Sequence, residues 1–192
     1  MNTSVFYFGG YKASQTDMNL WLGSARGQQP DVAFSAWPWP AGTRSDDVSA
    51  AAGARKAGIV KAAVAAIGQS GADKVYIVGH SSGCAIANAV DDELKDHDRI
   101  VLVALDGFSP GRGQLARAST QVWAAECDGV VTANHPSLRK AVGSRLKVWQ
   151  ATDCKRAWAL HFSVVNAASS DRTVTKVEQG YANCRANLMW MT

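Results

Sequence analysis

The sequence predicts an α/β fold in which a mainly parallel sheet is covered by helices on both faces, a three-layer α/β/α sandwich. Short runs rich in valine, isoleucine and aromatic residues recur along the chain, as expected for strands buried on both faces. Helix-forming stretches long enough for crossover connections separate several of these runs. The chain has 192 residues, of which 47% are hydrophobic and 19% are charged. This composition favours one globular domain over residues 1–192.

Six strands are expected, each a short apolar run bounded by turn residues. They cover residues 5–8, 32–37, 74–78, 100–105, 121–125 and 146–151. Helices are expected between and after them, over residues 45–67, 83–95, 136–142 and 171–187. The Trp-Pro-Trp-Pro run at residues 37–40 is interpreted as a rigid loop at the end of the second strand.

Charge and hydropathy argue against several kinds of partner. The 20 lysines and arginines exceed the 16 acidic residues by four, but they are scattered, so we expect no nucleic-acid partner. The sequence holds no apolar run near the length of a membrane span and no signal-peptide pattern at its start, so a cytoplasmic protein without membrane contact is expected. The four cysteines lack the paired spacing of a zinc site, so no metal is expected and the thiols should be reduced; these are Cys84, Cys127, Cys154 and Cys184.

Residues 79–83 form a Gly-His-Ser-Ser-Gly sequence that matches G-x-S-x-G. The motif stands between an apolar strand and a helix-forming run, which is the position of a nucleophile elbow, the sharp turn that presents a reactive serine. Glycines at its two ends allow the strand and the helix to pack closely. Ser81 is therefore the expected nucleophile.

Two backbone groups are candidates for the oxyanion hole, the donors that bind the negative oxygen of the reaction intermediate. The N–H of Ser82 lies at the start of the expected helix, where backbone donors have no partner within the helix. The loop after the first strand contains Gly9 and Gly10, so the N–H of Gly10 or Tyr11 is the second candidate.

A serine nucleophile requires a base, and His161 is the expected one. Where an elbow carries the serine, the acid and then the histidine follow it in the chain. His80 lies inside the elbow, His97 lies in a charged surface stretch and His135 opens an expected helix, whereas His161 follows the last strand and a loop.

The acid that orients the histidine is left open by the residues themselves. Two Asp-Gly pairs end successive strands, and either Asp106 or Asp128 could serve. In hydrolases that carry their serine at such an elbow, the acid often follows the later strand in a Gly-x-x-Asp-x-x-Val pattern. The surroundings of Asp128 resemble this pattern, with Ala125 in place of the glycine.

Three segments resemble the thioesterase branch of the α/β-hydrolase family, including the domains that release products from polyketide, nonribosomal peptide and fatty acid synthases. These segments are residues 79–87 around Ser81, residues 102–110 around Asp106, and residues 161–165 from His161. The resemblance implies the strand order 2-1-3-4-5-6. In the product-releasing domains the acid ends the earlier strand, which favours Asp106 narrowly over Asp128.

One departure concerns the lid, a helical insertion that these thioesterases carry after the strand ending at Asp106. Residues 107–120 leave no room for one, so an open cleft is expected, as in small lidless lipases and cutinase-like esterases. The sequence thus predicts a serine hydrolase without a cofactor, acting on a small-molecule ester or on a thioester that a carrier could hold. A lidless carboxylesterase or lipase is one alternative, and a non-catalytic binding protein of the same fold is the other.

Overall fold

A computed structural model describes residues 1–94, 98–107, 121–125, 140, 143–149, 161 and 188–191. Its centre is a six-stranded sheet in the order β2-β1-β3-β4-β5-β6, and every neighbouring pair is parallel. The strands are β1 (Thr3–Phe8), β2 (Ala33–Trp37), β3 (Lys74–His80), β4 (Ile100–Leu105), β5 (Gln121–Ala125) and β6 (Leu146–Trp149). All six expected strands and their order are therefore confirmed, and only their ends differ.

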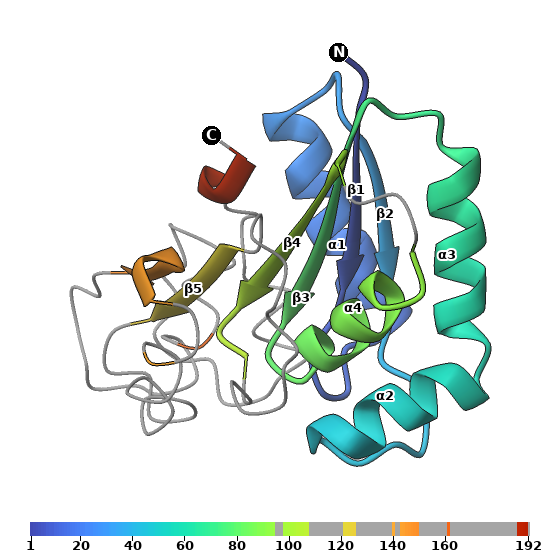
Figure 1. Cartoon of the computed structure of the whole chain (residues 1–192). Coiled ribbons are helices and arrows are strands. Elements are labelled where there is room, and N and C mark those ends of the chain that lie inside the picture. The colour runs from blue at the N-terminus through green and yellow to red at the C-terminus, as the bar shows by residue number, and fades with distance from the viewer. Residues whose placement is uncertain are drawn as a thin grey trace.

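Helices cover both faces of this sheet, which confirms the three-layer arrangement. One face carries α1 (Gln15–Gln28), and the other carries α2 (Asp47–Lys56), α3 (Ile59–Gln69) and α4 (Gly83–Asp91) (Figure 1). Tyr7 of β1 stacks on Trp21 of α1 with ring centroids 4.0 Å apart, so this helix is fixed to the sheet by an aromatic pair. The alternating side chains of β1 thereby serve both layers, because Phe6 and Phe8 point to the opposite face.

The single helix expected over residues 45–67 was wrong. Two helices occupy this segment, and the first ends near Ala57. Gly58 takes a left-handed backbone angle, φ 75°, which stops one helix and allows the chain to turn into the next. The Ala-rich composition on both sides concealed this break.

Helix α1 was not expected at all, because its sequence is polar and contains two glycines. Its start carries a recognisable signal, however. Ser14 accepts a hydrogen bond from the N–H of Asp17, and the Asp17 carboxylate accepts one from the N–H of Ser14. This reciprocal cap stabilises the first turn, and Met18, Trp21 and Ala25 then bury one stripe of the helix against the sheet.

The remaining expectations concern the ends of α4 and β6 and two helices in the second half of the chain. Helix α4 ends at Asp91 and not at residue 95. Strand β6 is described to Trp149. The helices expected over 136–142 and 171–187 fall almost entirely outside the described residues. Among the described residues, no helix is long and apolar enough to cross a membrane.

Candidate active site

The elbow is built at the end of β3, where the chain passes through Ser81 and Ser82 directly into α4. Ser81 has φ 54°, the left-handed region that non-glycine residues rarely adopt. Its N–H donates to the carbonyl oxygen of Leu105 at 2.9 Å, and its own carbonyl accepts from the N–H of Cys84 at 3.0 Å. The turn is therefore fixed by main-chain hydrogen bonds on both sides of Ser81.

Both glycines of the motif are required by close backbone contacts. A Cβ on Gly79 would lie 2.5 Å from the Cα of Cys84, and a Cβ on Gly83 would lie 2.5 Å from the carbonyl oxygen of Gly9. Real Cβ atoms do not approach other atoms so closely, so any larger residue would push α4 away from β3 or from the loop after β1. The sequence motif thus has a direct steric cause here.

Ser82 lies where the sequence placed it, at the start of α4. Its side chain donates a hydrogen bond to the carbonyl oxygen of Ser45 at 2.7 Å, and the residue is fully buried. The carbonyl of Gly10, in the loop between β1 and α1, accepts from the N–H of Ala13 at 3.0 Å. Since Gly83 packs against Gly9, this loop with Gly10 and Tyr11 lies beside the elbow.

Asp106 occupies the corresponding position at the end of the neighbouring strand. The register pairs His80 with Leu105, so Asp106 directly adjoins the elbow. Its φ is 52°, and its N–H donates to the carbonyl oxygen of Trp123 in β5 at 2.7 Å. The side chain is completely buried.

The structure brings His161 to this same place. Its Nδ1 lies 3.3 Å from Oδ2 of Asp106, and the imidazole is almost completely buried. Of the two candidate acids, Asp106 is thus the one described next to the histidine; Asp128 lies outside the described residues. A carboxylate at Nδ1 favours the tautomer that leaves Nε2 able to accept a proton.

His80 makes a contact that the sequence did not reveal. Its Nε2 lies 2.9 Å from the backbone carbonyl oxygen of His161, and the two rings are 4.8 Å apart between centroids. Because a carbonyl oxygen can only accept, Nε2 of His80 carries the proton and donates. The sequence gives no signal that the histidine inside the motif reaches His161.

Cys84 lies directly under the elbow, and its environment makes the thiol unreactive. Burial raises the pKa of Cys84 well above its ordinary value, and the thiol donates to the carbonyl oxygen of Gly79 at 3.1 Å. The cysteine is free, as expected; Cys127, Cys154 and Cys184 lie outside the described residues. Within the described part of the chain, no group of three potential ligands could hold a metal ion.

Comparison with solved structures identifies this architecture. The fold of esterase PE8 superposes with a TM-score of 0.53, covering 79% of this chain and 84% of that one at 21% identity. An α/β serine hydrolase without lid from Xanthomonas campestris also gives a TM-score of 0.53, over 83% of this chain and 78% of that one at 11% identity. The chain has the α/β-hydrolase fold.

A third structure supports the same assignment of the fold. The predicted CIB-like hydrolase of Thermoplasma acidophilum gives a TM-score of 0.53 over 78% of this chain and 75% of that one, at 16% identity. No family model matches the chain, and no curated protein matches its sequence. The α/β-hydrolase assignment is therefore a statement about the fold, and the chemistry must be argued from the site.

Proposed function

We propose that this chain is a serine hydrolase that cleaves an ester or thioester through an acyl-enzyme on Ser81. The observation that carries the proposal is the pairing of His161 with Asp106, 3.3 Å apart at the strand end next to the elbow. A buried carboxylate beside a buried imidazole is costly unless the two stabilise each other. A binding protein has no need of this pair next to a strained serine.

The first half of the reaction follows from these positions. His161 takes the hydroxyl proton of Ser81 on Nε2 while the serine oxygen attacks the carbonyl carbon, and Asp106 stabilises the resulting imidazolium. The N–H of Ser82 and that of Gly10 or Tyr11 bind the oxyanion. The intermediate then collapses: the bond to the alcohol or thiol breaks, and the leaving group takes the proton from His161.

The second half releases the acyl group to water. His161 removes a proton from a water molecule, and the hydroxide attacks the ester bond between Ser81 and the acyl group. Collapse of this second intermediate frees a carboxylic acid, and the proton on His161 returns to the serine oxygen. No cofactor takes part in any step.

An ester and a thioester differ in the leaving group, which is an alcohol in the first and a thiol in the second. The resemblance around Ser81, Asp106 and His161 favours a thioester, whereas the fold is shared with an esterase and with a serine hydrolase without lid. A lidless carboxylesterase is therefore the second candidate. Comparing kcat/KM for oxygen esters and thioesters of one acyl group separates the two.

The first test is intact-protein mass spectrometry after treatment with a fluorophosphonate, which reacts with activated serines. Wild type should gain one adduct, and Ser81→Ala and His161→Ala should gain none under the same conditions. Circular dichroism of each variant shows whether it is folded. A folded wild type that gains no adduct would overturn the hydrolase and favour the binding protein.

A further inference from the structure

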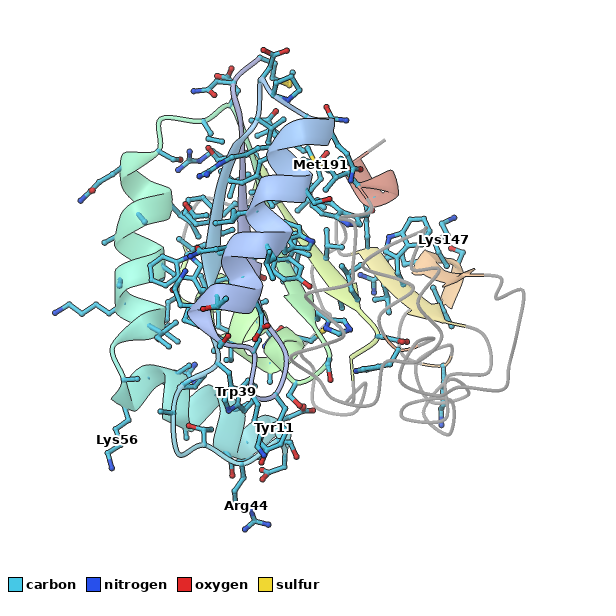
Figure 2. All side chains as sticks on the ribbon, turned by 180° about the vertical axis from the view of Figure 1, so that it is seen from behind. Tyr11, Trp39, Arg44, Lys56, Lys147 and Met191 are labelled. Atoms are coloured by element: carbon cyan, nitrogen blue, oxygen red, sulfur yellow. The ribbon has the colours of Figure 1, made fainter. Side chains whose placement is uncertain are left out.

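We infer that a cavity beside the elbow binds an anionic group of the substrate, so that the preferred ester or thioester carries a carboxylate or phosphate. The inference deepens the proposed function and rests on it. The cavity has a volume of about 540 Å³ and is lined by the loops that follow β1 and β2. Figure 2 shows three of its residues, Tyr11, Trp39 and Arg44, gathered at this end of the molecule.

Two contacts connect the cavity walls to the nucleophile. Ser82, next to Ser81, donates to the carbonyl oxygen of Ser45 at 2.7 Å, and Arg44 immediately precedes Ser45. On the other side, Gly83 packs against the carbonyl of Gly9 in the loop that leads to Tyr11. A group attached to an ester carbonyl at Ser81 therefore has the cavity as its neighbour.

The apolar wall of the cavity is held in place by aromatic packing. Tyr11 and Trp39 meet edge to face with ring centroids 5.7 Å apart. The indole N–H of Trp39 donates to the carbonyl oxygen of Thr43 at 3.3 Å, and the residue is 8% exposed. Such a wall suits a short hydrocarbon linker between the ester and a charged end.

The charges that line the cavity are both positive. Lys12 has its ammonium 5.3 Å from the centre of the Tyr11 ring, and the side chain of Arg44 is 88% exposed. Asp46 approaches Arg44 only at 3.7 Å and is itself half-exposed, so it neutralises little of that charge. Among the described residues that line the cavity, none carries a carboxylate.

The buried carboxylate of Asp17 lies three residues beyond Ser14 of the cavity lining and already has partners. Asp17 accepts from both the N–H and the hydroxyl of Ser14, at 2.9 and 2.5 Å. Lys12 also has φ 62°, an unfavourable angle for a lysine, and strained positions of this kind concentrate at ligand sites. The described lining thus presents two cations and no acid, with Asp46 outside the lining as a weak partner of Arg44, and such a set of charges favours an anion.

The test uses two matched substrate pairs, each with a neutral and an anionic member. On the acyl side, 4-nitrophenyl butanoate is compared with the 4-nitrophenyl monoester of glutaric acid. On the leaving-group side, the butanoyl thioester of N-acetylcysteamine is compared with that of coenzyme A, which carries phosphates. Wild type should have a higher kcat/KM for the anionic member of at least one pair. A preference in the first pair assigns the anion to the acyl group, and a preference in the second assigns it to the leaving group.

The double variant Lys12→Gln/Arg44→Gln should raise KM for that anionic substrate by about threefold to tenfold, the loss expected for two exposed charge contacts. The kcat/KM for the neutral member of the pair should fall much less than that for the anionic member. The control Lys56→Gln/Lys61→Gln removes the same net charge from exposed positions of α2 and α3. Added salt should weaken the preference in wild type, because exposed charges are screened.

Failure of this inference and failure of the hydrolase are distinguishable. Turnover of all substrates without a charge preference, or equal losses in both double variants, overturns the anion site and leaves the hydrolase standing. Absence of turnover overturns the hydrolase. Calorimetric titration of Ser81→Ala with glutarate and with coenzyme A then decides the site: binding that requires Lys12 and Arg44 supports it, and absence of binding overturns it.

A separate observation carries a second inference: His80 is a positioning residue for His161. His80 is 1% exposed, and its Nε2 donates to the His161 carbonyl at 2.9 Å. Asp106 holds the same histidine at Nδ1. His161 is thus anchored by its backbone from the end of β3 and by its side chain from the end of β4, and a displacement of about 1 Å can cost about a hundredfold in rate.

His80→Gln and His80→Met provide a matched test, because both side chains reach the position of the imidazole Nε2 but only glutamine donates a hydrogen bond. We expect His80→Met to lower kcat, and the rate of fluorophosphonate labelling, by about tenfold or more, with KM unchanged, and His80→Gln to recover most of this loss. Equal rates in the two variants would overturn the inference, because the loss would then belong to ring packing alone. A lower Tm with unchanged kcat would overturn it as well.

Discussion

The ends of β3 and β4 are adjacent, have nearly the same backbone conformation and are held differently. Ser81 and Asp106 have φ values of 54° and 52°, and each follows a residue paired in the register of the two strands. A left-handed non-glycine residue costs about 1–2 kcal/mol, so the fold accepts this cost twice at neighbouring strand ends. Strain at such positions is typical of functional sites.

The difference lies in what holds each residue. Ser81 is fixed by two main-chain hydrogen bonds, one to Cys84 within the turn and one to Leu105 of the neighbouring strand β4. Asp106 is fixed by Trp123 of the next strand and by His161, which is far away in the sequence. Both backbones thus use the next strand of the sheet, whereas the Asp106 side chain also pairs with a histidine that is distant in the sequence. Four changes test this contrast, in order of decreasing effect.

Replacing the serine should have the largest effect. Ser81→Ala removes the nucleophile and leaves the turn, so kcat should fall by about 10⁵-fold or more while Tm changes little. Steady-state ester hydrolysis and a thermal melt measure the two quantities. Substantial activity in a carefully purified Ser81→Ala protein would place the nucleophile elsewhere.

Replacing the acid should come next. Asparagine tolerates the left-handed conformation, so Asp106→Asn should keep the strand end and lower kcat by about 10⁴-fold, because the imidazole loses its orienting charge. Asp128→Asn is the matched variant and should remain near wild type. The opposite ranking would assign the acid to Asp128 and leave the Asp106–His161 contact a structural one.

The steric requirement at the end of β3 is tested by Gly79→Ala. Its Cβ would lie 2.5 Å from the Cα of Cys84, so the free energy of unfolding should fall by about 3 kcal/mol. Gly68→Ala in α3 is the control, since no atom lies within 4 Å of the added Cβ, and it should stabilise the protein by up to about 1 kcal/mol. Denaturant unfolding measures both, and equal values would contradict the steric explanation.

The smallest effect concerns the strain at Ser81. Ser81→Gly should be more stable than Ser81→Ala by about 1 kcal/mol, because glycine accepts a positive φ. At Ser82, with φ −60°, the order should reverse, since alanine is the better residue in a helical conformation. The same order at both positions would show that backbone conformation does not decide these stabilities.

The strands and the elbow of this protein could be predicted from its sequence because both depend on local residue patterns. The alternation of apolar runs and helical stretches predicted all six strands, and Gly79, Ser81 and Gly83 predicted the elbow, because a tight strand-to-helix turn restricts residue types at fixed spacing. The Ser14–Asp17 cap marks the start of α1, but the polar sequence after it did not predict a helix. The left-handed Gly58 between α2 and α3 was likewise not evident in an Ala-rich run.

What the sequence determined by itself was therefore the strands of the sheet and the position of the serine, because both depend on neighbours along the chain. The tertiary structure alone decided that Asp106 lies beside His161, that His80 holds the His161 carbonyl, and that Lys12 and Arg44 line one cavity. These contacts join residues whose separation in sequence carries no periodic signal. Only the parallel sheet, which gathers the carboxyl ends of its strands at one edge, brings them together.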